Sequence, residues 1–171
     1  MMMVHAALFM LVGIAFIIDA RKSMIPNRLT VTGVITGGIM HTCTQGWNGL
    51  WFALVGALSG FLALIVLYAL GALGAGDVKL FAAIGSIMGT AFVIQSIYYA
   101  LLFAGVIGIG LLIASKKMAE TGHKLAGWLI SLTILRDKSF ITGMKRQINI
   151  KFPFMYAALP GVLLVWYENF I

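Results

Sequence analysis

The sequence predicts an all-α integral membrane protein with six transmembrane helices. Of its 171 residues, 61% are hydrophobic and only 10% are charged, against roughly 25% charged residues in soluble domains. Long stretches contain no Asp, Glu, Lys or Arg, namely 1–18, 29–73, 80–115 and 152–167. A transmembrane helix needs about 20 residues, so each of the two longest stretches has room for two. Helices are expected because a backbone in lipid must satisfy its hydrogen bonds internally.

A single membrane-embedded domain, 1–171, is expected, with short loops between the helices. The loops are predicted at 19–28, 41–49, 74–79 and 89–96, with a longer one at 115–151. The predicted spans are approximately 2–18, 29–43, 50–73, 77–92, 95–114 and 152–169. The first span does not resemble a secretory signal, because it lacks a basic region before it and a small-residue cleavage site after it.

The distribution of positive charge predicts the orientation. All 12 Lys and Arg residues lie in the first, third and fifth loops, and none lies in the other loops or at the termini. The positive-inside rule therefore places these three loops in the cytoplasm and both termini on the non-cytoplasmic side of the cell membrane. The net charge of +7 is explained by this orientation in a lipid bilayer, with anionic lipid or a peptide as secondary contacts. A nucleic-acid partner is not expected, and the pattern leaves the oligomeric state open.

The long cytoplasmic loop contains an apolar segment of its own. Apolar residues recur there at helical spacing: Leu125, Trp128, Leu129, Leu132 and Leu135. The uncharged stretch 125–135 is too short to cross a bilayer, so we expect an interfacial helix below the headgroups. Such a helix anchors the loop to the membrane, and a role in guiding a substrate is the alternative.

No metal or cofactor is expected. Cys43 is the only cysteine, which excludes a disulfide framework and a cysteine-based zinc site. The three histidines, His5, His41 and His123, are scattered without ligand spacing.

Two of the five acidic residues lie where an apolar helix meets a cytoplasmic loop. Asp19 ends the first predicted span and Asp77 begins the fourth. Each alone could flank a helix end, and a carboxylate such as Asp77 is favoured at a helix N-terminus. Acids at this depth are, however, functional by default. Their shared side and depth would let a compact bundle bring them together.

Two carboxylates at one site cannot both ionise cheaply, so one keeps a proton while the other is a base. Such a pair can activate a water and protonate a leaving amide, which is aspartic proteolysis. Gly74 and Gly76, in "GAGD", would let an extended substrate approach the acid closely. The alternative is a proton-coupled small carrier or channel using Asp19 and Asp77, since acids also mark ion pathways. Both acids lie at the cytoplasmic edge, whereas carriers bind substrate near the midplane.

Two segments resemble those of the prepilin peptidases, a family of G-x-G-D membrane aspartic proteases. "GAGDVK", 74–79, is similar to the family's second aspartate motif, and "DARKSMIPNRLT", 19–30, to the segment of its first aspartate. "KFPFMYAALPG", 151–161, is similar to the entry of its last helix. The resemblance implies that Asp19 and Asp77 are catalytic. It also implies a substrate, a type IV prepilin or prepilin-like protein, with a short basic leader followed by an apolar helix.

The same resemblance implies roles for three further residues. Pro26 and Asn27 would shape the turn after the first helix and hold Asp19 in place, although a plain Pro-Asn turn fits equally well. Lys79 would either stabilise the ionised pair or extend to the membrane interface. Because the first span begins at once and Cys43 stands alone, the chain resembles the short form that lacks the methyltransferase region.

Overall fold

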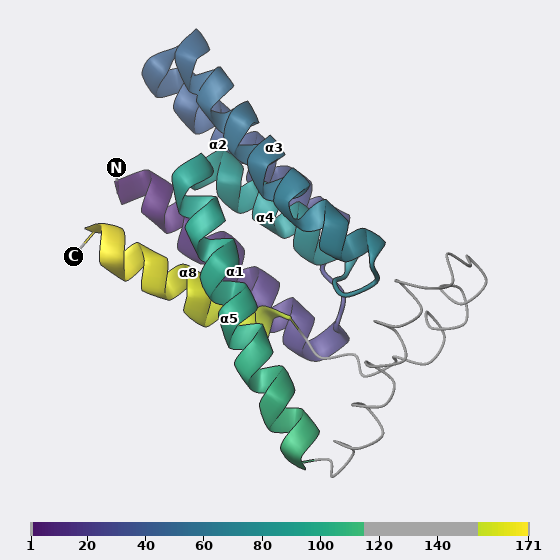
Figure 1. The fold of residues 1–171 in the computed structure, drawn as a ribbon. Helices are drawn as coiled ribbons and strands as arrows, with labels where there is room; N and C mark the ends of the chain where they lie inside the picture. The colour runs from purple at the N-terminus through teal and green to yellow at the C-terminus, as the bar shows by residue number, and fades with distance from the viewer. Residues whose placement is uncertain (1, 115–153, 171) are drawn as a thin grey trace, which may run out of the picture. The chain divides into compact units, whose positions relative to one another are not determined.

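The computed structural model describes residues 2–114 and 154–170. In these ranges the regular structure is entirely helical, which confirms the predicted all-α class (Figure 1). The helices are α1 (Met2–Lys22), α2 (Asn27–Gln45), α3 (Trp47–Ala69), α4 (Ala75–Met88), α5 (Thr90–Ala114) and α8 (Met155–Phe170). The predicted interfacial helix, at 125–135, lies outside the described residues.

Three of the described helices are long and apolar enough to cross a membrane: α1, α3 and the part of α5 from Thr90 to Leu111. The remaining three do not meet both conditions within the described residues. α4, with 14 residues, extends about 21 Å, less than the hydrocarbon thickness of about 30 Å. α2 has 19 residues but contains many threonines and glycines. Six crossings, and the side on which each terminus lies, therefore stay predictions.

Two glycines with positive φ separate neighbouring helices. α2 ends and α3 begins at Gly46, with a φ of 60°, and α4 gives way to α5 at Gly89, with a φ of 87°. Side chains other than glycine rarely adopt these backbone angles. The loops expected at 41–49 and 89–96 are therefore much shorter than predicted, because one glycine reverses or redirects the chain at each place.

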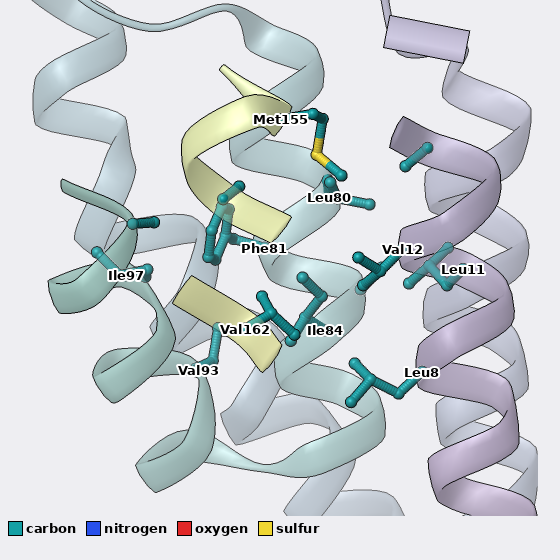
Figure 2. Packing of buried hydrophobic residues seen from close by; sticks show 14 of the residues in the cluster. Leu8, Leu11, Val12, Leu80, Phe81, Ile84, Val93, Ile97, Met155 and Val162 are labelled. Atoms are coloured by element: carbon teal, nitrogen blue, oxygen red, sulfur yellow. The ribbon is translucent and has the colours of Figure 1, made fainter. Parts of the chain in front are cut away.

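The chain forms two compact units, 1–104 with 152–171, and 105–151. In the first unit α4 is the central helix and packs against α1, α2 and α3. Apolar side chains from α1, α4, α5 and α8 meet in one core, where Leu8, Phe81 and Val162 are almost completely buried (Figure 2). From Leu80 to Met88 every residue of α4 is buried or partly buried, which is typical of a helix at the centre of a helical protein.

Small residues allow α2 and α3 to approach α4 at backbone distance. A Cβ atom on Gly56 of α3 would collide with the carbonyl oxygen of Gly85 in α4. On the α2 side, a Cβ atom on Gly37 would lie 2.7 Å from the backbone of Ser86. Because small residues let helices in membranes pack this closely, α4 is held between α2 and α3.

Two histidines form hydrogen bonds between helices of this unit. His41 Nε2 of α2 lies 2.8 Å from the carbonyl oxygen of Ile87 in α4. The indole Nε1 of Trp166 in α8 donates to His5 Nδ1 of α1 over 3.2 Å. Both side chains therefore have structural partners.

Candidate active site

Asp19 lies in the last turn of α1 and is buried, with 4% of its surface exposed. Its Oδ2 atom accepts a hydrogen bond of 3.2 Å from the backbone N–H of Met155, the first residue of α8. α1 ends just beyond it, where Ser23, with a φ of 48°, donates its N–H to the Asp19 carbonyl oxygen over 2.7 Å. Aspartates are rarely buried without a partner. α8 supplies that partner from the far end of the sequence.

Asp77 is the third residue of α4 and stands beside the start of the helix. Its Oδ2 atom accepts a hydrogen bond of 3.2 Å from the backbone N–H of Gly74, the residue that caps the helix. This is one half of a capping box, since glycine has no side chain to return the bond. The helix dipole favours a carboxylate here, so local structure alone places Asp77 at this end of α4.

The segments that carry the two acids contact each other directly. Ile25, in the turn after α1, packs over Gly76, where a Cβ atom would lie 3.0 Å from the Ile25 Cβ. Lys79 Nζ donates a 2.8 Å hydrogen bond to Asn27 Oδ1. Pro26, in extended conformation, precedes α2 and sets the direction of the chain between these two contacts.

These contacts bring Asp19 and Asp77 to the same end of the first unit. α1 and α4 pack together, and the segment after Asp19 meets the start of α4 through Ile25 and Gly76. Asp19 is enclosed, whereas Asp77 is only partly buried. The arrangement offers two carboxyl groups in different surroundings, one facing the interior and one nearer the surface.

Gly74 and Gly76 differ in what surrounds them. A Cβ atom on Gly74 would lie 3.1 Å from Asp77 Oδ2 and meet no other part of the chain outside its own turn. The space beside Gly76 is occupied by Ile25, not left open for a ligand. Gly74 therefore has the more open backbone beside the acid, and Gly76 allows the two segments to pack.

Two residues that contact the site, Ile25 and Met155, were not predicted from the sequence. Ile25 stands inside the segment "DARKSMIPNRLT", next to Pro26, but nothing in the sequence pairs it with Gly76. Met155 contributes a backbone N–H, which every non-proline residue has, so its residue type carried no signal. The only sequence signal for Met155 was that residues 151–161 resemble the start of the last helix in the prepilin peptidases.

The fold and the site define a class of protein: a helical membrane protein with one aspartate at the end of α1 and another at the start of α4, two helices that pack together. Residues 6–113 match the model of the type IV leader peptidase family, and the chain therefore belongs to this family. The match includes Asp19 and Asp77 and ends before α8.

Similar proteins include prepilin leader peptidase/N-methyltransferases of two Aeromonas species. The chain is 31% identical over 137 residues to the protein from Aeromonas salmonicida, which covers 72% of this chain and 46% of the relative. Identity to the Aeromonas hydrophila protein is also 31%, covering 47% of that relative. The Bacillus subtilis protein of the same name is 29% identical over 99 residues, 56% of this chain and 39% of the relative. The chain thus spans less than half the length of these relatives. No solved structure matches the chain significantly.

Proposed function

We propose that this protein is an aspartic endopeptidase that removes the leader peptide from type IV prepilins or prepilin-like proteins. One observation carries the proposal: the fold joins the segment after Asp19 to the segment around Asp77, through Ile25 against Gly76 and Lys79 against Asn27. Membership of the type IV leader peptidase family supports a peptidase. The catalytic pair supplies the aspartic mechanism.

The proposed reaction is hydrolysis by general acid–base catalysis. One carboxylate takes a proton from a water, whose oxygen attacks the carbonyl carbon of the scissile amide. The protonated partner gives its proton to the carbonyl oxygen and forms a tetrahedral diol. As the diol collapses, the C–N bond breaks, the amide nitrogen receives a proton from one aspartic acid, and a hydroxyl group of the diol gives its proton to the other aspartate, so the pair again shares one proton. The products are a leader with a new carboxyl group and a mature chain with a new amine, and the two aspartates titrate as one unit.

The surroundings of the two acids support cleavage at the cytoplasmic face of the cell membrane. Arg21, Lys22, Arg28 and Lys79 lie in the same two segments as Asp19 and Asp77. Basic residues at the ends of membrane helices are retained in the cytoplasm. A leader that has not crossed the membrane would meet the acids on that side.

The proposed substrate follows from the family and from the names of the relatives. Prepilin-type substrates, by the resemblance stated above, carry a short basic leader before an apolar helix. Such a helix enters the bilayer directly after the cleaved bond. An enzyme with its acids at the end of its helices can reach that bond at the membrane surface.

Purified protein mixed with a full-length prepilin tests the proposal. We expect two products by mass spectrometry, a free leader and a mature chain, from the wild-type protein and none from Asp19→Asn or Asp77→Asn. The carrier alternative makes a different prediction: intact prepilin, and proton uptake into proteoliposomes that depends on Asp19 and Asp77. Intact prepilin with every tested pilin class would contradict the proposal.

A further inference from the structure

A groove opens between α2 and α3, away from the two aspartates. We call it the α2–α3 groove. Its volume is about 410 Å³, and its lining includes Ile35, Gly38 and Cys43 of α2, Leu50 and Leu54 of α3, and Ser86 of α4. This volume is within the range of ~300–1,000 Å³ that is usual for ligand pockets. It is enough for several side chains of a docked segment.

The lining of the groove is mostly apolar, and the hydroxyl groups of its polar side chains already donate hydrogen bonds to backbone carbonyl groups. The hydroxyl group of Thr42 donates to the carbonyl oxygen of Gly38 over 2.7 Å. The hydroxyl group of Ser86 donates to the carbonyl oxygen of Val34 over 3.0 Å. With these protons used inside the protein, the lining favours an apolar ligand over a polar one.

Burial shows the form of the groove. Ala53 and Ser86, at 2% and 1% exposure, form its bottom, whereas Ile35 and Leu54, at 53% and 44%, form its rim. At Gly38 a Cβ atom would meet no atom within 4 Å, so the space above this backbone is open. A ligand can therefore enter sideways, from the surface that apolar rim residues present to the membrane.

The α2–α3 groove is connected to the candidate active site by α2 itself. The helix begins at Asn27, which binds Lys79, and Ile35 and Cys43 follow at ~12 Å and ~24 Å along the axis. Between Asn27 and Cys43 runs a ridge of exposed residues four apart: Val31, Ile35 and Ile39, at 53%, 53% and 59% exposure. Such ridges are the surfaces against which other helices pack.

We infer that the α2–α3 groove binds the apolar helix of the substrate, the segment that follows the cleaved bond. The inference rests on the proposed function. A bond held between Asp19 and Asp77 fixes the start of that helix, and the ridge of α2 leads from there into the groove. A lipid chain could also fill an apolar groove, but nothing would hold it at the aspartates, whereas the substrate helix is joined to the bond that they hold. Large apolar side chains of the substrate fill the groove, about 8 to 16 residues after the bond.

Cys43 gives a direct test, because it lines the groove and is the only cysteine of the chain. Prepilins with one cysteine at successive helix positions are mixed with the Asp77→Asn variant in membranes and exposed to a mild oxidant. We expect disulfide cross-linking to peak ~16 residues after the bond, with a period of 3–4 residues. The Cys43→Ser variant should show none. Cross-linking at no position, or equally at all positions, would contradict the inference.

A second test fills the groove at Gly38. Gly38→Leu should raise KM for full-length prepilin by about tenfold, because the added side chain occupies the binding space. A peptide that spans the bond but lacks the apolar helix should be cleaved as by the wild type. Gly13→Leu in α1 is the matched control, because a Cβ atom there also meets no atom within 4 Å.

The outcomes separate the inference from the proposed function. If Gly38→Leu cleaves prepilin as well as Gly13→Leu does, or slows peptide and prepilin equally, the groove does not bind the helix. Both results leave cleavage by the wild type intact. Failure of the wild-type protein to cleave any prepilin would instead remove the proposed function, and the inference with it.

Discussion

Lys79 Nζ donates a hydrogen bond to Asn27 Oδ1 over 2.8 Å, between residues 52 positions apart in the chain. The bond ties the second turn of α4 to the first residue of α2, close to the contact of Ile25 with Gly76. Reasoning from sequence left Lys79 with two roles, stabilising the ionised pair or extending to the interface. The structure gives it a third, as a connection between the two segments that hold Asp19 and Asp77.

A double-mutant cycle measures this connection. Lys79→Ala and Asn27→Ala should each lower kcat/KM for prepilin by ~3- to 10-fold, since such a bond contributes about 0.5–1.5 kcal/mol. The double variant should be no worse than either single variant. Lys22→Ala is the control, because it removes an exposed positive charge from the end of α1 without breaking this bond. Additive losses would show that the two side chains act separately.

Asp19→Asn and Asp77→Asn should each abolish cleavage while leaving expression and membrane insertion unchanged. A shared-proton pair needs both members, so each single loss should reach at least ~10²-fold, and the double variant should be no slower. Cleavage is measured by gel mobility and insertion by alkaline extraction of membranes. Substantial activity in either verified variant would exclude the pair as the catalytic group.

Met155 offers a test of the hydrogen bond to Asp19 that is independent of side-chain chemistry. Proline is tolerated at the first position of a helix but lacks the N–H that donates to Asp19 Oδ2. Met155→Ala removes the buried side chain alone, and Met155→Pro removes the side chain and the donor.

We expect Met155→Pro to lower kcat/KM by a further ~10- to 100-fold relative to Met155→Ala, since a hydrogen bond to a charged group contributes about 1.5–3 kcal/mol. The thermal midpoint in detergent should be similar for both variants. Equal rates in the two would mean that α8 does not position Asp19 for catalysis.

Gly76→Ala should destabilise the protein by about 1–3 kcal/mol, the usual effect of overpacking. The added Cβ would press against Ile25, and Gly76→Val would press harder. Gly13→Ala is the matched control, which should instead be neutral or stabilising because its surroundings are open. Thermal midpoints in detergent are compared with cleavage rates. A stable Gly76→Val with normal cleavage would show that Ile25 moves aside freely.

Orientation in the membrane is tested by cysteine labelling in a Cys43→Ala background. Gly46 has a φ of 60° and is unsuitable for a cysteine, so the probe for the connection between α2 and α3 is placed at the exposed Asn48, in the first turn of α3. Met24, 72% exposed, is the probe for the first loop. An impermeant maleimide added to intact cells should label Asn48→Cys, and Met24→Cys only after lysis. The reverse pattern would place the two acids on the outer face.

Residue order alone predicted the all-α class and singled out the two acids as candidates for the site. Apolar stretches predicted the helices, because helix formation in lipid depends on local composition and length. Asp19 and Asp77 stood out because charges are costly at the end of apolar segments. The predicted ends of the helices were less accurate. Single glycines with positive φ, Gly46 and Gly89, stand where composition suggested longer loops.

Only the tertiary structure decided which residues surround the acids. Lys79 with Asn27, Ile25 with Gly76, and the Met155 N–H with Asp19 join segments that are distant in the chain. The α2–α3 groove likewise depends on how two helices pack against α4. Helical periodicity reports which face of a helix is apolar, but not which helix it meets or at what register. Which helices meet, and at what register, depends on side-chain packing throughout the core, and a local pattern of residues cannot predict it.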